Sequence, residues 1–283
     1  MSAEQRSAAR RCFGVTSFWW VIPLCAGIIL ASLMPCPVVG LIRLFGEIGP
    51  LSAGDLIAQI SYARRQPEVR AVVLVLDSPG GTAVDTEAVY LELMRLRQSK
   101  PVVGLVTGMA ASGAYYLAVG TDYIFAHPTS DVGNVGVITE LPAEPSVWEN
   151  VLATGPYKMW GSPRDTAMRR MEMAKQGFYQ AVQLGRGGAL QIEQETLLRG
   201  EVWLGSEALR LGLIDELGSQ AQAVEKAAQM ARIAHYGVAD LYGLAGLSPR
   251  PTPTSPPEEE RAPRSRQPGL YLLYIPPEER RWP

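Results

Sequence analysis

The sequence predicts an α/β fold built around a parallel sheet, and three observations support this. Residues 69–76 form a nearly continuous apolar run, broken by Arg70, as expected for a strand buried on both faces of a parallel sheet. Further strands are expected at residues 38–44, 102–106 and 123–126. Stretches with helical spacing separate these strands, and strand–helix–strand units of this length join parallel strands through right-handed crossovers.

Three helices are expected between these strands. The first spans residues 52–66 and begins at Ser52, which has Asp55 three positions later, the spacing of a helix start. The second spans residues 85–98 and the third residues 111–119. From about residue 166 the pattern is mainly helical, with candidates at 168–184, 191–199, 206–211 and 220–233.

The composition excludes several classes of protein. Of the 283 residues, 47% are hydrophobic and the net charge is −2, so the chain is neither disordered nor a nucleic-acid-coating protein. The three cysteines, Cys12, Cys25 and Cys36, all lie near the N-terminus. The remaining chain therefore contains no cysteine nucleophile, Cys-rich zinc site or disulfide framework.

The N-terminal region, residues 1–37, is predicted to be a cytoplasmic flank and a membrane anchor. Arg6, Arg10 and Arg11 precede an apolar stretch whose core is residues 13–34, long enough to span a bilayer. The basic flank places the N-terminus in the cytoplasm and the rest of the chain on the outer side of the cell membrane, as a single-pass protein. The alternative is a cleaved signal peptide, although residues 31–35 make a poor cleavage site.

Two further regions follow the anchor. Residues 38–240 are predicted to form the globular domain, and residues 241–283 a Pro-rich flexible tail. The tail contains an apolar patch at residues 270–274. This patch resembles an extended peptide that could dock into a substrate groove, and the alternative is an ordinary packing segment or surface anchor.

Ser112 is the candidate nucleophile. It lies in a run of small residues, 108–116, where a strand passes through a turn into a helix. Small neighbours leave the hydroxyl accessible, and a helix N-terminus favours developing negative charge. The alternative is that Ser112 only caps the helix.

Glycines near the same edge of the sheet are candidate oxyanion donors. Residues 77–81 are predicted as a turn after the buried strand, and Gly80 and Gly81 let backbone N–H groups point at a substrate oxygen. The N–H of Gly113, which follows the nucleophile, is a further candidate. The alternative is a plain tight turn.

A serine nucleophile also needs a base, and Lys158 is the best candidate. His127 and His235 lie in settings typical of surface or packing residues. Only Lys158 among the four lysines is flanked by apolar and aromatic residues, and burial among such groups lowers the pKa of an ammonium group. The alternative is a lysine whose stem merely covers apolar surface.

These motifs occur in an order that resembles the signal peptide peptidase A family of serine peptidases. They are Leu76-Asp77-Ser78-Pro79-Gly80-Gly81, Ala110-Ala111-Ser112-Gly113-Ala114-Tyr115-Tyr116, Gly133-Asn134-Val135-Gly136-Val137-Ile138, Gly155-Pro156-Tyr157-Lys158 and residues 208–218. The resemblance covers about residues 38–235 and the N-terminal anchor. It implies a Clp protease/crotonase-like fold, a repeated β-β-α/βαβ spiral with a parallel sheet.

The resemblance also implies a Ser-Lys dyad of Ser112 and Lys158, with Gly80 or Gly81 and Gly113 as the oxyanion hole. It implies a homo-oligomeric ring, apolar substrates such as remnant signal peptides, and neither a metal nor another cofactor. Asn134 departs from the family, which often has a serine there that helps to position the lysine. Its carboxamide oxygen could take that role.

The sequence thus predicts a membrane-anchored serine endopeptidase that cleaves apolar peptide or membrane-protein segments and binds no nucleic acid. Neutral Lys158 would take the proton from Ser112, which attacks the scissile carbonyl. One alternative is a catalytically inactive membrane scaffold of the same fold, and another is a stomatin-processing relative.

Overall fold

The computed structural model describes residues 22–27, 36–142, 144–145, 152–248 and 270–273. The chain divides into two units, Met1–Pro37 and Val38–Pro283. In the first unit, residues 22–27 are helical. None of the helices in the described ranges is both long and apolar enough to cross a membrane. Most of the anchor predicted at residues 13–34 lies outside those ranges.

The second unit is built on an eight-stranded sheet, which confirms the predicted mixed α/β fold with a mostly parallel sheet. Along its main path the strand order is β10-β1-β2-β4-β5-β9, and every neighbouring pair is parallel. β6 adds to β4 in parallel, and β8 pairs antiparallel with β6. The strands are β1 (Val38–Phe45), β2 (Val69–Ser78), β4 (Val102–Ala111), β5 (Tyr123–Ala126), β6 (Asp131–Gly133), β8 (Val202–Leu204), β9 (Glu216–Leu217) and β10 (Gly237–Asp240).

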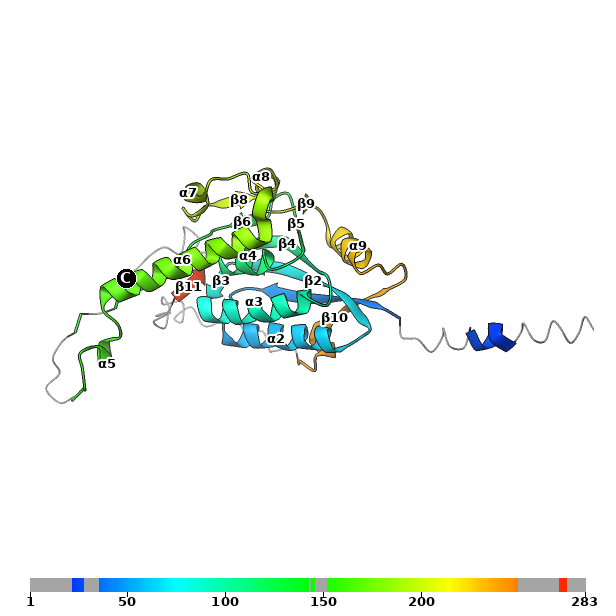
Figure 1. Cartoon of the computed structure of the whole chain (residues 1–283), viewed down its shortest axis with the longest axis horizontal. Helices are drawn as coiled ribbons and strands as arrows, with labels where there is room; N and C mark the ends of the chain where they lie inside the picture. Colours follow the sequence, from blue (N-terminus) through cyan, green and yellow to red (C-terminus); the bar gives the residue numbers. More distant parts are fainter. Residues whose placement is uncertain (1–21, 28–35, 143, 146–151, 249–269, 274–283) are drawn as a thin grey trace, which may run out of the picture. The chain divides into compact units, whose positions relative to one another are not determined.

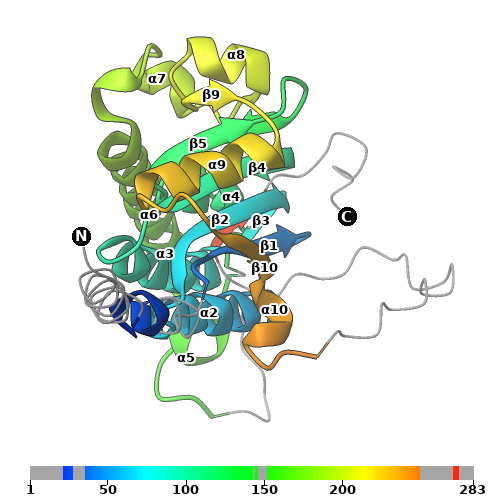
Figure 2. The ribbon, with the colours of Figure 1, turned by 90° about the vertical axis from the view of Figure 1, so that its right-hand side faces the viewer.

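Helices cover both faces of this sheet. α2 (Pro50–Arg65), α3 (Ala83–Arg97) and α4 (Gly113–Ala118) contribute to the larger core on one face, and α9 (Gln220–Met230) to a smaller core on the other (Figures 1 and 2). Alternate residues of β2 enter the two cores: Leu74 faces the first, and Val73 and Val75 face the second. This double burial explains why the strand is an almost unbroken apolar run.

The prediction of a turn at residues 77–81 is wrong, because strand structure continues through most of it. β2 extends to Ser78, and Gly80–Thr82 form β3. β3 belongs to a second, three-stranded sheet with the order β3-β11-β7. Its other members are β7 (Ile138–Thr139) and β11 (Leu270–Leu273), which lies in the predicted tail and pairs antiparallel with both neighbours.

The chain after β7 forms a helical arm. α5 (Tyr157–Trp160) precedes α6 (Arg164–Arg186), and α6 extends to one side of the sheet with α5 near its outer end (Figure 1). The candidate helix at residues 191–199 is shorter than predicted. The remaining helices are a 3₁₀ turn (Gly187–Ala189), α7 (Gln194–Leu197), α8 (Gly205–Arg210) and α10 (Leu241–Leu244).

Candidate functional site

Ser112 joins β4 to α4 in a conformation that few residues other than glycine adopt. Its φ is 53° and its ψ is −118°, and the residue is 1% exposed. The Ser112 N–H donates to the Gly133 carbonyl at 2.8 Å, which fixes the turn against β6. The side chain makes no capping hydrogen bond to α4, so helix capping does not account for this serine. Strained backbone of this kind costs free energy and is concentrated at functional sites.

Gly80 and Gly113 line one small space beside Ser112. A Cβ atom on Gly80 would lie 2.0 Å from the Leu272 carbonyl oxygen and 2.7 Å from the Gly113 nitrogen. A Cβ atom on Gly113 would lie 3.0 Å from the same Leu272 oxygen. Gly80 also has a φ of +96°, which disfavours any side chain. The two glycines therefore leave room for a carbonyl oxygen, and the Leu272 oxygen of β11 lies there.

The backbone around Gly80 is held by its neighbours. The Gly80 N–H donates to the Oγ of buried Ser78 at 3.1 Å, and its carbonyl accepts from Ile48 at 2.7 Å. A Cβ atom on Gly81 would lie 1.9 Å from the Ile48 carbonyl oxygen. Of the three predicted oxyanion donors, Gly80 thus already has a hydrogen-bond acceptor within the chain. The sequence alone suggested no separate role for Ser78, although this residue lies within the motif formed by residues 76–81.

Lys158 is exposed and lies away from Ser112 of the same chain. The inner part of α6 packs on α4, where the rings of Phe178 and Tyr116 are 5.1 Å apart. Phe178 lies 14 residues after Arg164, the first residue of α6, which corresponds to about 21 Å of helix rise. Figure 1 shows α5, which contains Lys158, beyond that outer end. The structure therefore does not bring the two predicted dyad residues together within one chain.

Lys100 is the lysine that burial affects most clearly in the described structure. Its Nζ donates to the Ala63 and Gln66 carbonyls at the end of α2, and burial lowers its pKa. It precedes β4, whereas Ser112 follows the other end of that strand, and ten strand residues span about 33 Å. Lys100 therefore stabilises the α2 terminus and cannot serve Ser112.

Asn134 is held in a turn by two hydrogen bonds. Its backbone N–H donates to the Glu201 carbonyl at 2.7 Å, and its Nδ2 donates to the Gly200 carbonyl at 2.6 Å. Its φ of 55° is one that asparagine tolerates better than most residues. These contacts give Asn134 a structural role after β6, and the predicted contact with Lys158 is not formed within one chain.

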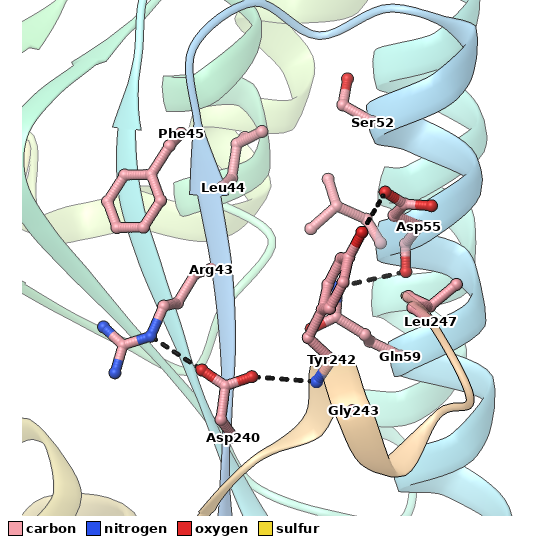
Figure 3. Close-up of a pocket in the computed structure, with 11 residues that line it drawn as sticks. Arg43, Leu44, Phe45, Ser52, Asp55, Gln59, Asp240, Tyr242, Gly243 and Leu247 are labelled. Atoms are coloured by element: carbon pink, nitrogen blue, oxygen red, sulfur yellow. Dashed lines mark hydrogen bonds and ion pairs between the residues drawn. The ribbon is translucent and has the colours of Figure 1, made fainter. Parts of the chain in front are cut away.

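A separate cavity of about 690 Å³ lies between β1, α2 and α10, and no predicted site residue lines it. Figure 3 shows Arg43 paired with Asp240, and the Tyr242 hydroxyl directed at Asp55. The Oε1 atom of Gln59, a residue that lines this cavity, is buried without a hydrogen-bond partner. Within the described part of the chain, no group of three or more His, Cys, Asp or Glu side chains could hold a metal ion.

Comparisons with known proteins identify similar chains. The family model described as Peptidase family S49 matches residues 94–234, and the model described as Clp protease matches residues 39–132. Protease 4 of Haemophilus influenzae is 33% identical over 194 residues, which cover 63% of this chain and 31% of the relative. The chloroplastic serine protease SPPA of Arabidopsis thaliana is 29% identical over 220 residues, covering 69% of this chain and 32% of the relative.

A Synechocystis sp. relative, slr0021, matches over more of its own length. It is 30% identical over 199 residues, which cover 65% of this chain and 72% of the relative. By contrast, the chain spans about a third of the length of the Haemophilus and Arabidopsis relatives that it matches.

Proposed function

The chain belongs to peptidase family S49, a serine protease family, and from this we propose that it is an endopeptidase with Ser112 as nucleophile and Lys158 as general base. The observation that carries the proposal is the buried, strained Ser112 beside a space, lined by Gly80 and Gly113, that holds a peptide carbonyl oxygen. Acyl transfer requires a nucleophile next to a space that can hold the oxyanion of the tetrahedral intermediate.

The proposed reaction passes through an acyl-enzyme. The Ser112 hydroxyl attacks the scissile carbonyl carbon as its proton passes to the Nζ atom of Lys158. The oxyanion accepts hydrogen bonds from backbone N–H groups, for which Gly113 and Gly81 are the candidates because the Gly80 N–H already donates to Ser78. The peptide C–N bond breaks as the proton moves to the leaving amine, and water then hydrolyses the ester.

Lys158 completes the site of a neighbouring copy in this proposal. Support comes from the arm, which carries Lys158 away from its own Ser112 and exposes Met168 and Met173 on α6. Exposed apolar side chains on a projecting helix are typical of a surface that another subunit covers. A homo-oligomeric ring, in which each arm reaches the next subunit, would unite the two residues.

The proposed substrates are apolar, extended peptide segments near a membrane, such as remnant signal peptides. Support for the apolar character comes from β11, whose Tyr271 and Leu272 are buried where this strand pairs with β3, close to Ser112. The membrane location follows from the anchor predicted at residues 13–34, with the N-terminus cytoplasmic and the catalytic unit on the outer side.

Mixing two inactive variants tests the shared site. Ser112→Ala and Lys158→Ala should each abolish cleavage of an unstructured apolar peptide. If the chains are refolded together at equal amounts, a quarter of the sites pair an intact Ser112 with an intact Lys158 from its neighbour. The mixture should therefore recover about a quarter of the wild-type rate.

The control is Lys175→Ala, which removes an α6 lysine that pairs with Glu172 at 2.6 Å and should keep the wild-type rate. If the mixture stays inactive while both variants assemble normally, Lys158 does not act on a neighbouring copy. Full activity of Ser112→Ala would remove the nucleophile assignment.

A further inference from the structure

We infer that residues 270–273 bind the peptide groove as a tethered pseudosubstrate, with the Leu272 carbonyl in the place of the scissile carbonyl. Substrate must displace this segment before it can reach Ser112. The inference rests on the proposed function, because it takes Ser112 and the adjacent glycines as the reacting centre.

The first argument is the position of β11 within the second sheet. β11 is the middle strand, and it pairs with β3 on one side and β7 on the other. β3 contains Gly80 and Gly81, the glycines next to the nucleophile. Adding a strand between two edges is a common way for proteins to bind an extended peptide, because the main chain supplies the hydrogen bonds and the side chains occupy pockets.

The second argument is the register of the pairing. Leu272 lies opposite Gly81, and its carbonyl oxygen occupies the space lined by Gly80 and Gly113. In a peptidase complex, the residue whose carbonyl lies at the oxyanion donors is the one before the scissile bond. This register makes Leu272 the counterpart of that residue.

The third argument is the burial of the side chains. Leu272 is 5% exposed and belongs to the main hydrophobic core cluster, and Tyr271 is 9% exposed. β11 also lies against α3 and α4, the helix that follows Ser112. The pocket beside the nucleophile therefore accepts a leucine side chain, and a similar aliphatic residue is expected at that place in substrates.

Self-occupation predicts weakened binding of other peptides. A site that its own tail fills is open for only a fraction of the time, and the apparent affinity for a second peptide falls by that fraction. Leu272→Asp places a carboxylate in an apolar pocket without a partner, which should release the tail. Leu184→Asp is the matched control, because it adds the same charge at a leucine that is 83% exposed.

The test measures binding in full-length protein that carries Ser112→Ala, so that cleavage does not interfere. The probe is a fluorescent peptide with the sequence of residues 267–277, followed by fluorescence anisotropy. Adding Leu272→Asp should tighten binding by at least about tenfold, and adding Leu184→Asp should leave it unchanged. A probe with aspartate in place of its own Leu272 should bind the released groove much more weakly.

Equal affinity of all three proteins for the probe would overturn the inference, and so would tight binding of the aspartate probe. If Leu272→Asp lowers the melting temperature, Leu272→Ser repeats the test with a smaller change. Failure of the catalytic proposal is distinguishable. If the wild-type protein cleaves no peptide but the Leu272→Asp variant still binds the probe more tightly, the inference about the groove stands and the proposed dyad is wrong.

Discussion

At the scale of single residues, the site depends on backbone conformations that ordinary side chains resist. Ser112 has a φ of 53°, and Gly80 has a φ of +96° with no room for a Cβ atom. The Gly80 N–H donates to the Ser78 side chain, and the Ser112 N–H donates to the Gly133 carbonyl. The strained backbone of Ser112 is thus held by a hydrogen bond to β6, and the adjacent Gly80 is held by a separate one to Ser78.

Replacing Gly80 by alanine should damage the site more than the fold. The added methyl group would collide with the Leu272 carbonyl oxygen and the Gly113 nitrogen, and the positive φ adds about 1–2 kcal/mol of strain. We expect loss of peptide cleavage and of probe binding, with a modest fall in melting temperature. Steady-state kinetics and thermal denaturation would measure both effects.

Gly54→Ala is the matched change outside the site. Gly54 lies within α2, and no atom lies within 4 Å of the position its Cβ would take. Alanine there should leave cleavage unchanged and stabilise the helix by up to about 1 kcal/mol. Equal losses of activity in both variants would mean that Gly80 has no special role.

At the scale of elements, an ion pair between a buried arginine and a partly buried aspartate fixes α6 to the sheet. Arg186 at the end of α6 pairs with Asp215 at 2.8 Å and donates to the Gly212 carbonyl. The same segment accepts a 2.9 Å hydrogen bond from the hydroxyl of Tyr115 in α4, at the Leu213 carbonyl. Burial raises the pKa of Tyr115, so its hydroxyl stays protonated and keeps donating. The base of the arm and the helix after Ser112 are therefore attached to one segment.

Arg186→Leu should lower the free energy of unfolding by about 3 kcal/mol, because it removes the cation that pairs with Asp215 and leaves the carboxylate with the Ile124 N–H as its only partner among the described residues. Arg169→Leu breaks an exposed pair with Asp165 on the same helix and should cost less than about 1 kcal/mol. Chemical denaturation of both variants measures the difference. Equal costs would show that the Arg186–Asp215 pair adds no more stability than an exposed one.

Four strands of the main sheet, β1, β2, β4 and β5, could be predicted from the sequence because they are apolar runs, whereas the short strands β6, β8, β9 and β10 were not predicted. β2 and β5 stand out as apolar runs, and β5 begins and ends where it was predicted. β3 could not be predicted, because two of its three residues are glycines that carry no side-chain pattern. It forms through pairing with Ile48 and with β11, contacts that lie far apart in sequence.

At the scale of the whole molecule, the proposed site depends on the arm of a neighbouring copy. Local motifs sufficed to predict that Ser112, Gly80 and Gly113 lie close together, because they occur where strands end and a helix begins. The proposed partnership with Lys158 could not be derived in this way. Its apolar neighbours indicated burial, yet Tyr157 and Met159 are 46% and 41% exposed in the single chain. In the proposed assembly a neighbouring copy would bury this lysine, and a local sequence pattern does not reveal such a contact.

Charging the arm should separate assembly from folding. Met168 and Met173 are 58% and 73% exposed, so replacing both by glutamate should spare the fold but oppose contact with a neighbour. We expect light scattering to show a smaller assembly and the rate of cleavage to fall with it. Val84→Glu, at a residue of α3 that is 76% exposed, should change neither property. An unchanged assembly in the double variant would exclude the arm as an interface.

The placement of β11 between two strands has a consequence for what can enter. A bound segment must be drawn out to about 3.3 Å per residue, whereas a helix advances only about 1.5 Å. A helical apolar segment that leaves a bilayer would have to become extended over at least four residues, the length of β11, before the enzyme could bind it. The helical stability of a substrate segment, as much as the identity of its side chains, would then decide which segments escape cleavage.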